Sequence, residues 1–236
     1  MKHLNQFITE YIIKKKLENP IDSEDHYDYY PESKEELTEN IEELVNKGIY
    51  NFNCIDTSAI TDMSYLFKHI DLYNTNFNIS KWNVSNVTNM NYMFNGCISF
   101  DGDLSNWDVS NVLSMASMFD KCQNFTGKGL ENWDVSKVRN MPCLFMNCRK
   151  FNVDLSNWNT SNVRNLSHTF AKCTKFEGKG LDKWKTTNFV HTNNMFLDCK
   201  NFNCDLSKWK LKNILDMSGM FDGCTSLKNK PRWYKK

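Results

Sequence analysis

The sequence predicts an α/β repeat solenoid, a leucine-rich-repeat-like array of seven strand–turn–short-helix rungs with an N-terminal helical cap. Two rows of residues predict it. Tryptophans at positions 82, 107, 133, 158, 184 and 209 recur at steps of 25, 26, 25, 26 and 25 residues. Six cysteines from Cys97 to Cys224 keep the same step, and each follows a phenylalanine by three residues. A fixed period of this size is typical of stacked repeats that contact only their neighbours.

The alternating step arises at one turn of the repeat. Longer repeats contain Gly-Lys-Gly at 127–129 and 178–180, where shorter ones have one residue fewer. These segments lack the longer glycine-lysine pattern of a phosphate-binding loop, and we interpret them as turns. The full period is therefore 51 residues, which indicates duplication of a two-rung unit.

Hydrophobic spacing changes within each rung. The segment 104–109, Leu-x-x-Trp-x-Val, predicts a short strand. Val112, Met115, Met118 and Phe119 then follow at steps of three and four, which favours a short helix. A degenerate first rung with Ile55 in the tryptophan position brings the count to seven.

The segments on either side of the array predict covers for its ends. Residues 1–48 are expected to form a helical cap, with an apolar helical face near the start and a capping box at 33–36. Ile41, Leu44 and Val45 would face one way, and Gly48 would end that helix. The array itself would span 49–227, and 228–236 would form a C-terminal tail or cap, with Trp233 outside the repeat period.

The repeat resembles a known family. Trp107-Asp-Val-Ser-Asn-Val112, followed by Met115, Phe119 and Cys122, is similar to the roughly 25-residue repeat of BspA-like bacterial surface proteins. The spacing Phe-x-x-Cys-x-x-Phe also resembles treponemal-type leucine-rich repeats. The resemblance covers about residues 52–227. Family members are often exported, and several resemble adhesins or host-interaction proteins, so the resemblance is compatible with a binding surface. Similar arrays also occur in large DNA viruses and protists.

Composition narrows the classes of partner. The net charge of +1 provides no overall field for nucleic acid, and we expect no nucleic-acid partner. No apolar stretch is long enough to span a bilayer, and the first residues do not resemble a secretory signal. These features favour an intracellular or virion-associated protein over a secreted one.

Chemistry-bearing residues point away from catalysis. Stacked cysteines run parallel, which fits neither disulfide torsions nor tetrahedral zinc, so we expect them to fill the core. His168 and His191 lack a partner in any nucleophilic signature. We therefore expect no enzyme activity, no cofactor and no metal. A buried asparagine row is expected to bond the backbones of neighbouring rungs; it comprises Asn86, Asn111, Asn162, Asn188 and Asn213, and Lys137 interrupts it.

Outward-facing positions next to each tryptophan change from acidic to basic along the chain. Two aspartates in the middle rungs and five lysines in the last two are the candidate partner-binding residues: Asp108, Asp134, Lys183, Lys185, Lys208, Lys210 and Lys212. Graded charge on an extended surface suits a protein-interaction module with an acidic partner. The alternative is a structural component of a cell surface or virion. A neighbouring copy could supply the acids from 35–43, which is a route to self-association.

Overall fold

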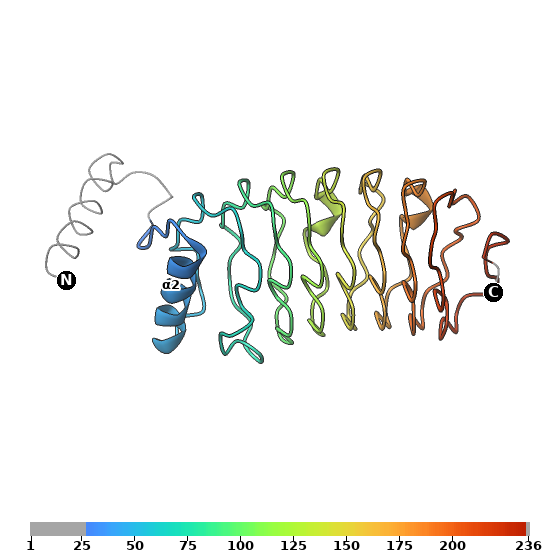
Figure 1. The fold of residues 1–236 in the computed structure, drawn as a ribbon. Coiled ribbons are helices and arrows are strands. Elements are labelled where there is room, and N and C mark those ends of the chain that lie inside the picture. The colour runs from blue at the N-terminus through green and yellow to red at the C-terminus, as the bar shows by residue number, and fades with distance from the viewer. Residues whose placement is uncertain (1–26, 235–236) are drawn as a thin grey trace, which may run out of the picture.

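A computed structural model describes residues 27–234. Figure 1 shows an elongated row of stacked rungs with one helix at its N-terminal end. The helical elements are α2 (Lys34–Asn46) and two short 3-10 turns, η1 (Leu130–Asn132) and η2 (Leu181–Lys183). The apolar helical face that the sequence predicts near the N-terminus lies outside the described residues.

The predicted α/β solenoid of strand–helix rungs is wrong. Among residues 27–234, α2 is the single α-helix. Within this range the rungs pair with one another through single parallel bridges that do not extend into β-strands. The segment 104–109 is not extended, because the Trp107 N–H donates back to the Leu104 carbonyl oxygen at 3.2 Å. The Val112 N–H donates likewise to the Val109 carbonyl oxygen at 2.9 Å. Each rung is thus a succession of turns.

The helix predicted over 112–119 is absent because its backbone bonds are shared between rungs. An α-helix directs each N–H to a carbonyl four residues earlier. Here alternate N–H groups donate to the next rung at 2.8–3.1 Å; they belong to Met115, Ser117, Phe119 and Lys121. Of the N–H groups between them, those of Met118 and Asp120 donate to carbonyl oxygens three residues earlier, whereas the Ala116 N–H donates to the Asn91 side-chain oxygen of the preceding rung at 2.7 Å. Ser117 and Lys121 have left-handed φ values of 53° and 68°. Consecutive three-residue turns give the same apolar spacing as a helix.

A ladder of single parallel bridges links seven successive rungs. In each rung the bridged residue directly precedes the position that Met115 occupies. The bridged residues are Asp62, Asn89, Ser114, Asn140, Asn165, His191 and Asp216. Because the same position is paired in every rung, the side chains of each sequence row lie above one another. The sequence register therefore becomes a spatial register along the whole array.

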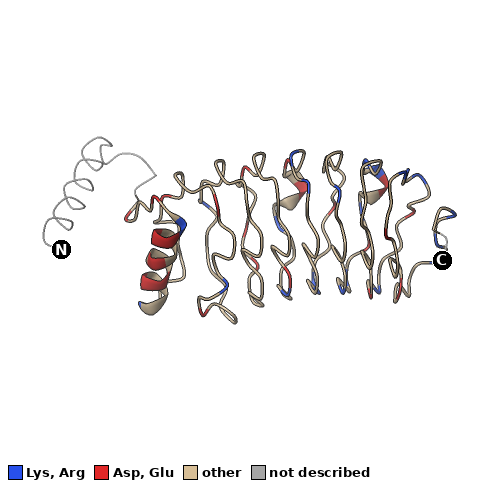
Figure 2. Cartoon of the chain, in the orientation of Figure 1, with Lys and Arg blue, Asp and Glu red and all other residues tan. Residues whose placement is uncertain are grey.

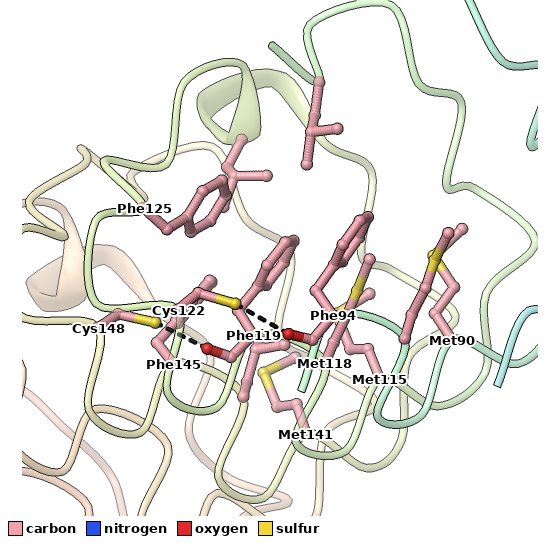
Figure 3. Packing of buried hydrophobic residues seen from close by; sticks show 14 of the residues in the cluster. Met90, Phe94, Met115, Met118, Phe119, Cys122, Phe125, Met141, Phe145 and Cys148 are labelled. Atoms are coloured by element: carbon pink, nitrogen blue, oxygen red, sulfur yellow. Dashed lines mark hydrogen bonds between the residues drawn. The ribbon is translucent and has the colours of Figure 1, made fainter. Parts of the chain in front are cut away.

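The core consists of these aligned rows. Phe94 and Phe119 stack with ring centroids 5.2 Å apart and planes inclined by 3°, and both are fully buried. Figure 3 shows the cysteines beside them, where the Cys122 thiol donates to the Phe94 carbonyl oxygen at 3.1 Å. Cys148 repeats this contact with Phe119 at 3.0 Å. The thiols therefore bond backbone between rungs, and the nine cysteines are all free.

Tryptophans form a second buried row. The Trp158 and Trp184 rings stack at 6.2 Å with planes 2° apart, and the Trp184 indole N–H donates to the Leu155 carbonyl oxygen at 3.0 Å. Trp233, which the sequence places outside the period, continues this row. It stacks on Trp209 at 6.1 Å and donates to Leu206 at 2.8 Å. A half-buried tryptophan thus ends the array.

Helix α2 contacts the N-terminal end of the core. Ser33 caps it by accepting a hydrogen bond from the Glu36 N–H at 3.1 Å, as the capping box predicts. Leu37, Ile41 and Leu44 are buried, and Val45 packs against the same core. Gly48 follows with a left-handed φ of 72°. In the part of the chain that the structure describes, no helix has the length and apolarity needed to cross a membrane.

Candidate interaction surface

The five candidate lysines, here called the lysine surface, comprise Lys183, Lys185, Lys208, Lys210 and Lys212. All five are exposed, as the sequence predicts. They flank Trp184 and Trp209, whose rings stack at 6.5 Å, so they project from two adjacent rungs. Among residues 27–234, none of them has a carboxylate within the 4.0 Å of an ion pair. The surface therefore presents unpaired positive charge.

Two of these lysines, Lys183 and Lys208, act electrostatically on nearby aspartates. The pKa of Asp154 is lowered mainly by hydrogen bonds from Ser156 and further by the charge of Lys183. The pKa of Asp205 is lowered mainly by the Ser207 N–H and further by Lys208. In the described part of the chain, neither aspartate forms an ion pair with its lysine. Each therefore offsets only part of the positive charge of Lys183 or Lys208.

The candidate aspartates have a structural task. The Asp108 carboxylate accepts the Ser110 N–H at 3.0 Å, and Asp134 accepts the Ser136 N–H at 2.9 Å. Such bonds close a turn within the side chain's own segment. Hydrogen bonds from Ser110 lower the pKa of Asp108. Both aspartates are exposed, but their place in the turn explains them without a partner.

The same turn distinguishes the lysine surface from the other rungs. Asn83 and Asn159 accept the equivalent bonds at 3.1 and 3.3 Å. Lys185 and Lys210 occupy this position in the last two rungs, and an ammonium group cannot accept a hydrogen bond. In the first rung, Asp56 accepts the equivalent bond from the Ser58 N–H at 3.0 Å. The two lysine rungs therefore lack a turn-closing bond that five others have, and they expose a positive charge in its place.

Charge is separated along the array, as Figure 2 shows. Helix α2 carries five exposed glutamates: Glu35, Glu36, Glu39, Glu42 and Glu43. The only ion pair that one of them makes within the described residues is that of Glu43 with Lys47. The two ends of the described molecule consequently differ in the sign of their exposed charge.

The asparagine row bonds neighbouring rungs, as the sequence predicts. The side-chain amide of Asn162 donates to the Ser136 carbonyl oxygen at 2.7 Å, and Asn188 donates to Ser161 at 2.6 Å. Lys137 interrupts the row and bonds the Asn111 side chain at 2.6 Å. The expected burial of this row is wrong, because it lies at the surface and most of its members are exposed.

Beside the asparagine row lies a groove that the sequence analysis missed. It has a volume of about 520 Å³ and is lined by Arg139, Asn140, Asn162, Arg164 and Asn188. We call it the arginine groove. The signal was present in the sequence as two arginines 25 residues apart in successive rungs, but a pair in a single row is a weak pattern when the row also contains Thr, Leu and Val.

The repeat is matched by a known family. The family described as Mycoplasma protein of unknown function, DUF285, matches residues 35–129 and 113–233. The chain belongs to the DUF285 family. Comparison with curated proteins and with solved structures returned no match. Together the two matches run from the first turn of α2 through the rungs to Trp233.

Buried thiols of this DUF285 chain are poor nucleophiles. Burial raises the pKa of Cys97 to about 12, and it also raises the pKa of the half-buried Cys143. Cys143 and His168 occupy equivalent positions in adjacent rungs, but the high pKa keeps the thiol protonated. Among the described residues, no three His, Cys, Asp or Glu side chains are grouped as metal ligands.

Proposed function

We propose that this chain is a non-enzymatic protein-interaction module that presents the outward rows of its rungs to a macromolecular partner. The lysine surface is the part that engages an acidic partner. One observation carries the proposal: Lys185 and Lys210 replace side chains that close a turn in five other rungs. A residue that forgoes a structural bond and exposes an unpaired charge favours a role outside the fold.

Charge crowding supports the same function. Like charges on adjacent rungs repel one another, and neither an ion pair nor burial compensates them here. An acidic partner would relieve this repulsion and would be steered toward the surface over a Debye length of about 8 Å at physiological salt. The resemblance of the repeat to BspA-like surface proteins, several of which resemble adhesins, supports the same function.

The alternative is a structural or assembly component in which copies of the chain bind one another. The exposed glutamates of α2 support it, because a second copy could offer them to the lysine surface. Sedimentation velocity at low and high salt separates the two functions. A monomer at every salt concentration supports the partner-binding module, whereas salt-sensitive oligomers of the isolated chain support assembly.

The proposal is tested by using the chain and its Lys185→Glu/Lys210→Glu variant as paired baits in extract from the native source. We expect the parent to retain acidic proteins that the variant loses, with retention falling as salt rises. Reversal of Arg149 and Lys150, both exposed on the turn after Cys148, serves as a charge-matched control. Identical protein sets on all three baits would contradict a role for the lysine surface.

A further inference from the structure

The arginine groove places two guanidinium groups side by side without a counter-charge. Arg139 and Arg164 occupy the same position in adjacent rungs, and the Arg164 N–H donates to the Arg139 carbonyl oxygen at 2.9 Å. Both side chains are exposed. Within residues 27–234, no carboxylate lies within 4.0 Å of either guanidinium. Two neighbouring positive groups that lack an acid within the fold are arranged for an external anion.

The residues around the groove do not supply that anion. The next carboxylate along the bridge ladder is Asp216, and its pKa is lowered mainly by Ser218 and also by the charge of His191. On the other side, Asp134 accepts the turn bond of Ser136. Lys137 adds a further positive charge at the edge of the asparagine row. Both carboxylates are held by their own turns, and the charged residues that line the groove itself are Arg139 and Arg164.

The amides of the groove indicate what kind of molecule carries the anion. Asn162 and Asn188 each use one side-chain N–H to bond the preceding rung. Their second N–H and their carbonyl oxygen make no hydrogen bond within the described residues. A row that offers both donors and acceptors matches the alternating N–H and C=O groups of an extended peptide.

The row that contains the arginines also offers apolar contact. Leu113 precedes Arg139 in this row and has 45% of its surface exposed, and Val190 follows Arg164. The groove has no aromatic side chain in its lining on which a nucleic-acid base could stack. These features favour a peptide that combines carboxylates with apolar residues over a nucleic acid.

We infer that the arginine groove binds an extended acidic segment of a partner protein, with Arg139 and Arg164 each pairing with a carboxylate. The inference rests on the proposed protein-interaction function and adds a second, central site to the lysine surface. Alternate side chains of an extended peptide lie about 6.6 Å apart on one face, and neighbouring rungs lie about 5 Å apart. The flexible stems of the two arginines can span that difference, and a planar guanidinium can bind a carboxylate through two parallel hydrogen bonds.

The test is fluorescence anisotropy of a labelled peptide of alternating glutamate and alanine, titrated with the full chain at low salt. We expect saturable binding that Arg139→Gln and Arg164→Gln each weaken about tenfold. Arg149→Gln removes the same charge from an exposed position outside the groove lining and should leave the affinity unchanged. The matching glutamine–alanine peptide should not bind.

Comparison with the Lys185→Glu/Lys210→Glu variant separates this inference from the proposed function. Loss of binding in the lysine variant with no effect of either arginine substitution would overturn the groove site and leave the lysine surface standing. An equal effect of Arg149→Gln would reduce the groove to diffuse charge. Tighter binding of heparin than of the peptide at the same arginines would reassign the groove to sulfated glycans. Absence of binding by the parent chain would overturn both sites. Circular dichroism melting of each variant confirms that the fold is retained.

Discussion

The inward and outward rows of this molecule follow different rules. Inward rows keep one chemistry from rung to rung, because the stacked phenylalanines, cysteines and tryptophans are buried along the array, with Cys224 and Trp233 half-buried at its C-terminal end. Outward rows change. The position after tryptophan passes through Asn83, Asp108, Asp134, Asn159, Lys185 and Lys210. Close packing requires uniform side chains in the inward rows but not in the outward rows. Changes in the outward rows are therefore the place to look for a function other than folding.

The largest effect should come from an inward row in the middle of the array. Trp133 is 2% exposed, stacks on Trp107 at 6.3 Å, and donates to the Leu104 carbonyl oxygen at 3.3 Å. Trp133→Ala should lower the free energy of unfolding by about 3–5 kcal/mol, because it leaves a large cavity. Denaturant unfolding measures this loss.

Trp233 sharpens the comparison within the same row. It stacks on Trp209 and bonds Leu206, but it is only partly buried at the end of the array. Trp233→Ala should therefore cost less than half of the Trp133 value, roughly 1–2 kcal/mol. Equal losses at the two positions would mean that burial in the middle of the stack does not determine stability.

Glycine positions give the next effect. A methyl group on Gly129, whose φ is 93°, would lie 2.3 Å from the backbone nitrogen of Ser105 in the preceding rung. Gly129→Ala should cost about 3 kcal/mol through strain and overlap. Gly48 has a φ of 72° but no atom within 4 Å of the added carbon. Gly48→Ala should cost only about 1 kcal/mol, and a larger loss there than at Gly129 would refute the close approach of rungs.

The sequence predicts the core and fails on the backbone for an identifiable reason. Steps of three and four from Val112 to Met115 and on to Phe119 arise from a helix and equally from successive tight turns. What decides between them is the partner of each N–H, and for Ser117 that partner lies in the next rung. Tertiary pairing of this kind leaves no trace in the hydrophobic spacing. The capping box of α2 was predictable because its bonds are local.

The candidate surface was predictable to a similar degree. The row position of the lysines follows from the repeat, and the structure places all five at the surface. The turn bond of Asp108 was missed, although an aspartate two residues before a serine is a local pattern. The arginine groove depends on two rows coming together across rungs, and that spacing is set by the turns.

Asp120 should give a smaller effect that depends on pH. It is 6% exposed and accepts hydrogen bonds from the side chains of Asn95 and Asn147. Burial raises its pKa above the ordinary value of 3.8, with Asn147 offsetting part of the change. Below pH 3.8 the carboxyl is protonated in both states, and stability falls as pH rises from 3.8 through the raised pKa of the folded state.

Asp120→Asn should remove this dependence. The variant should match the parent below pH 3.8 and become more stable than the parent as pH rises through the raised pKa of Asp120. Urea unfolding across this pH range measures the difference. A variant that loses stability relative to the parent as pH rises would show that the Asp120 carboxylate stabilises the fold.

The smallest change in stability should come from the outward row, because the lysines there are expected to bind a partner and not to stabilise the fold. Lys185 and Lys210 are exposed and make no ion pair within the described residues. The unfolding free energy of Lys185→Glu/Lys210→Glu should therefore lie within about 0.5 kcal/mol of the parent for each substitution. A loss of 2 kcal/mol or more would show that the lysines belong to the fold, and would contradict the assignment of the outward rows to partner binding.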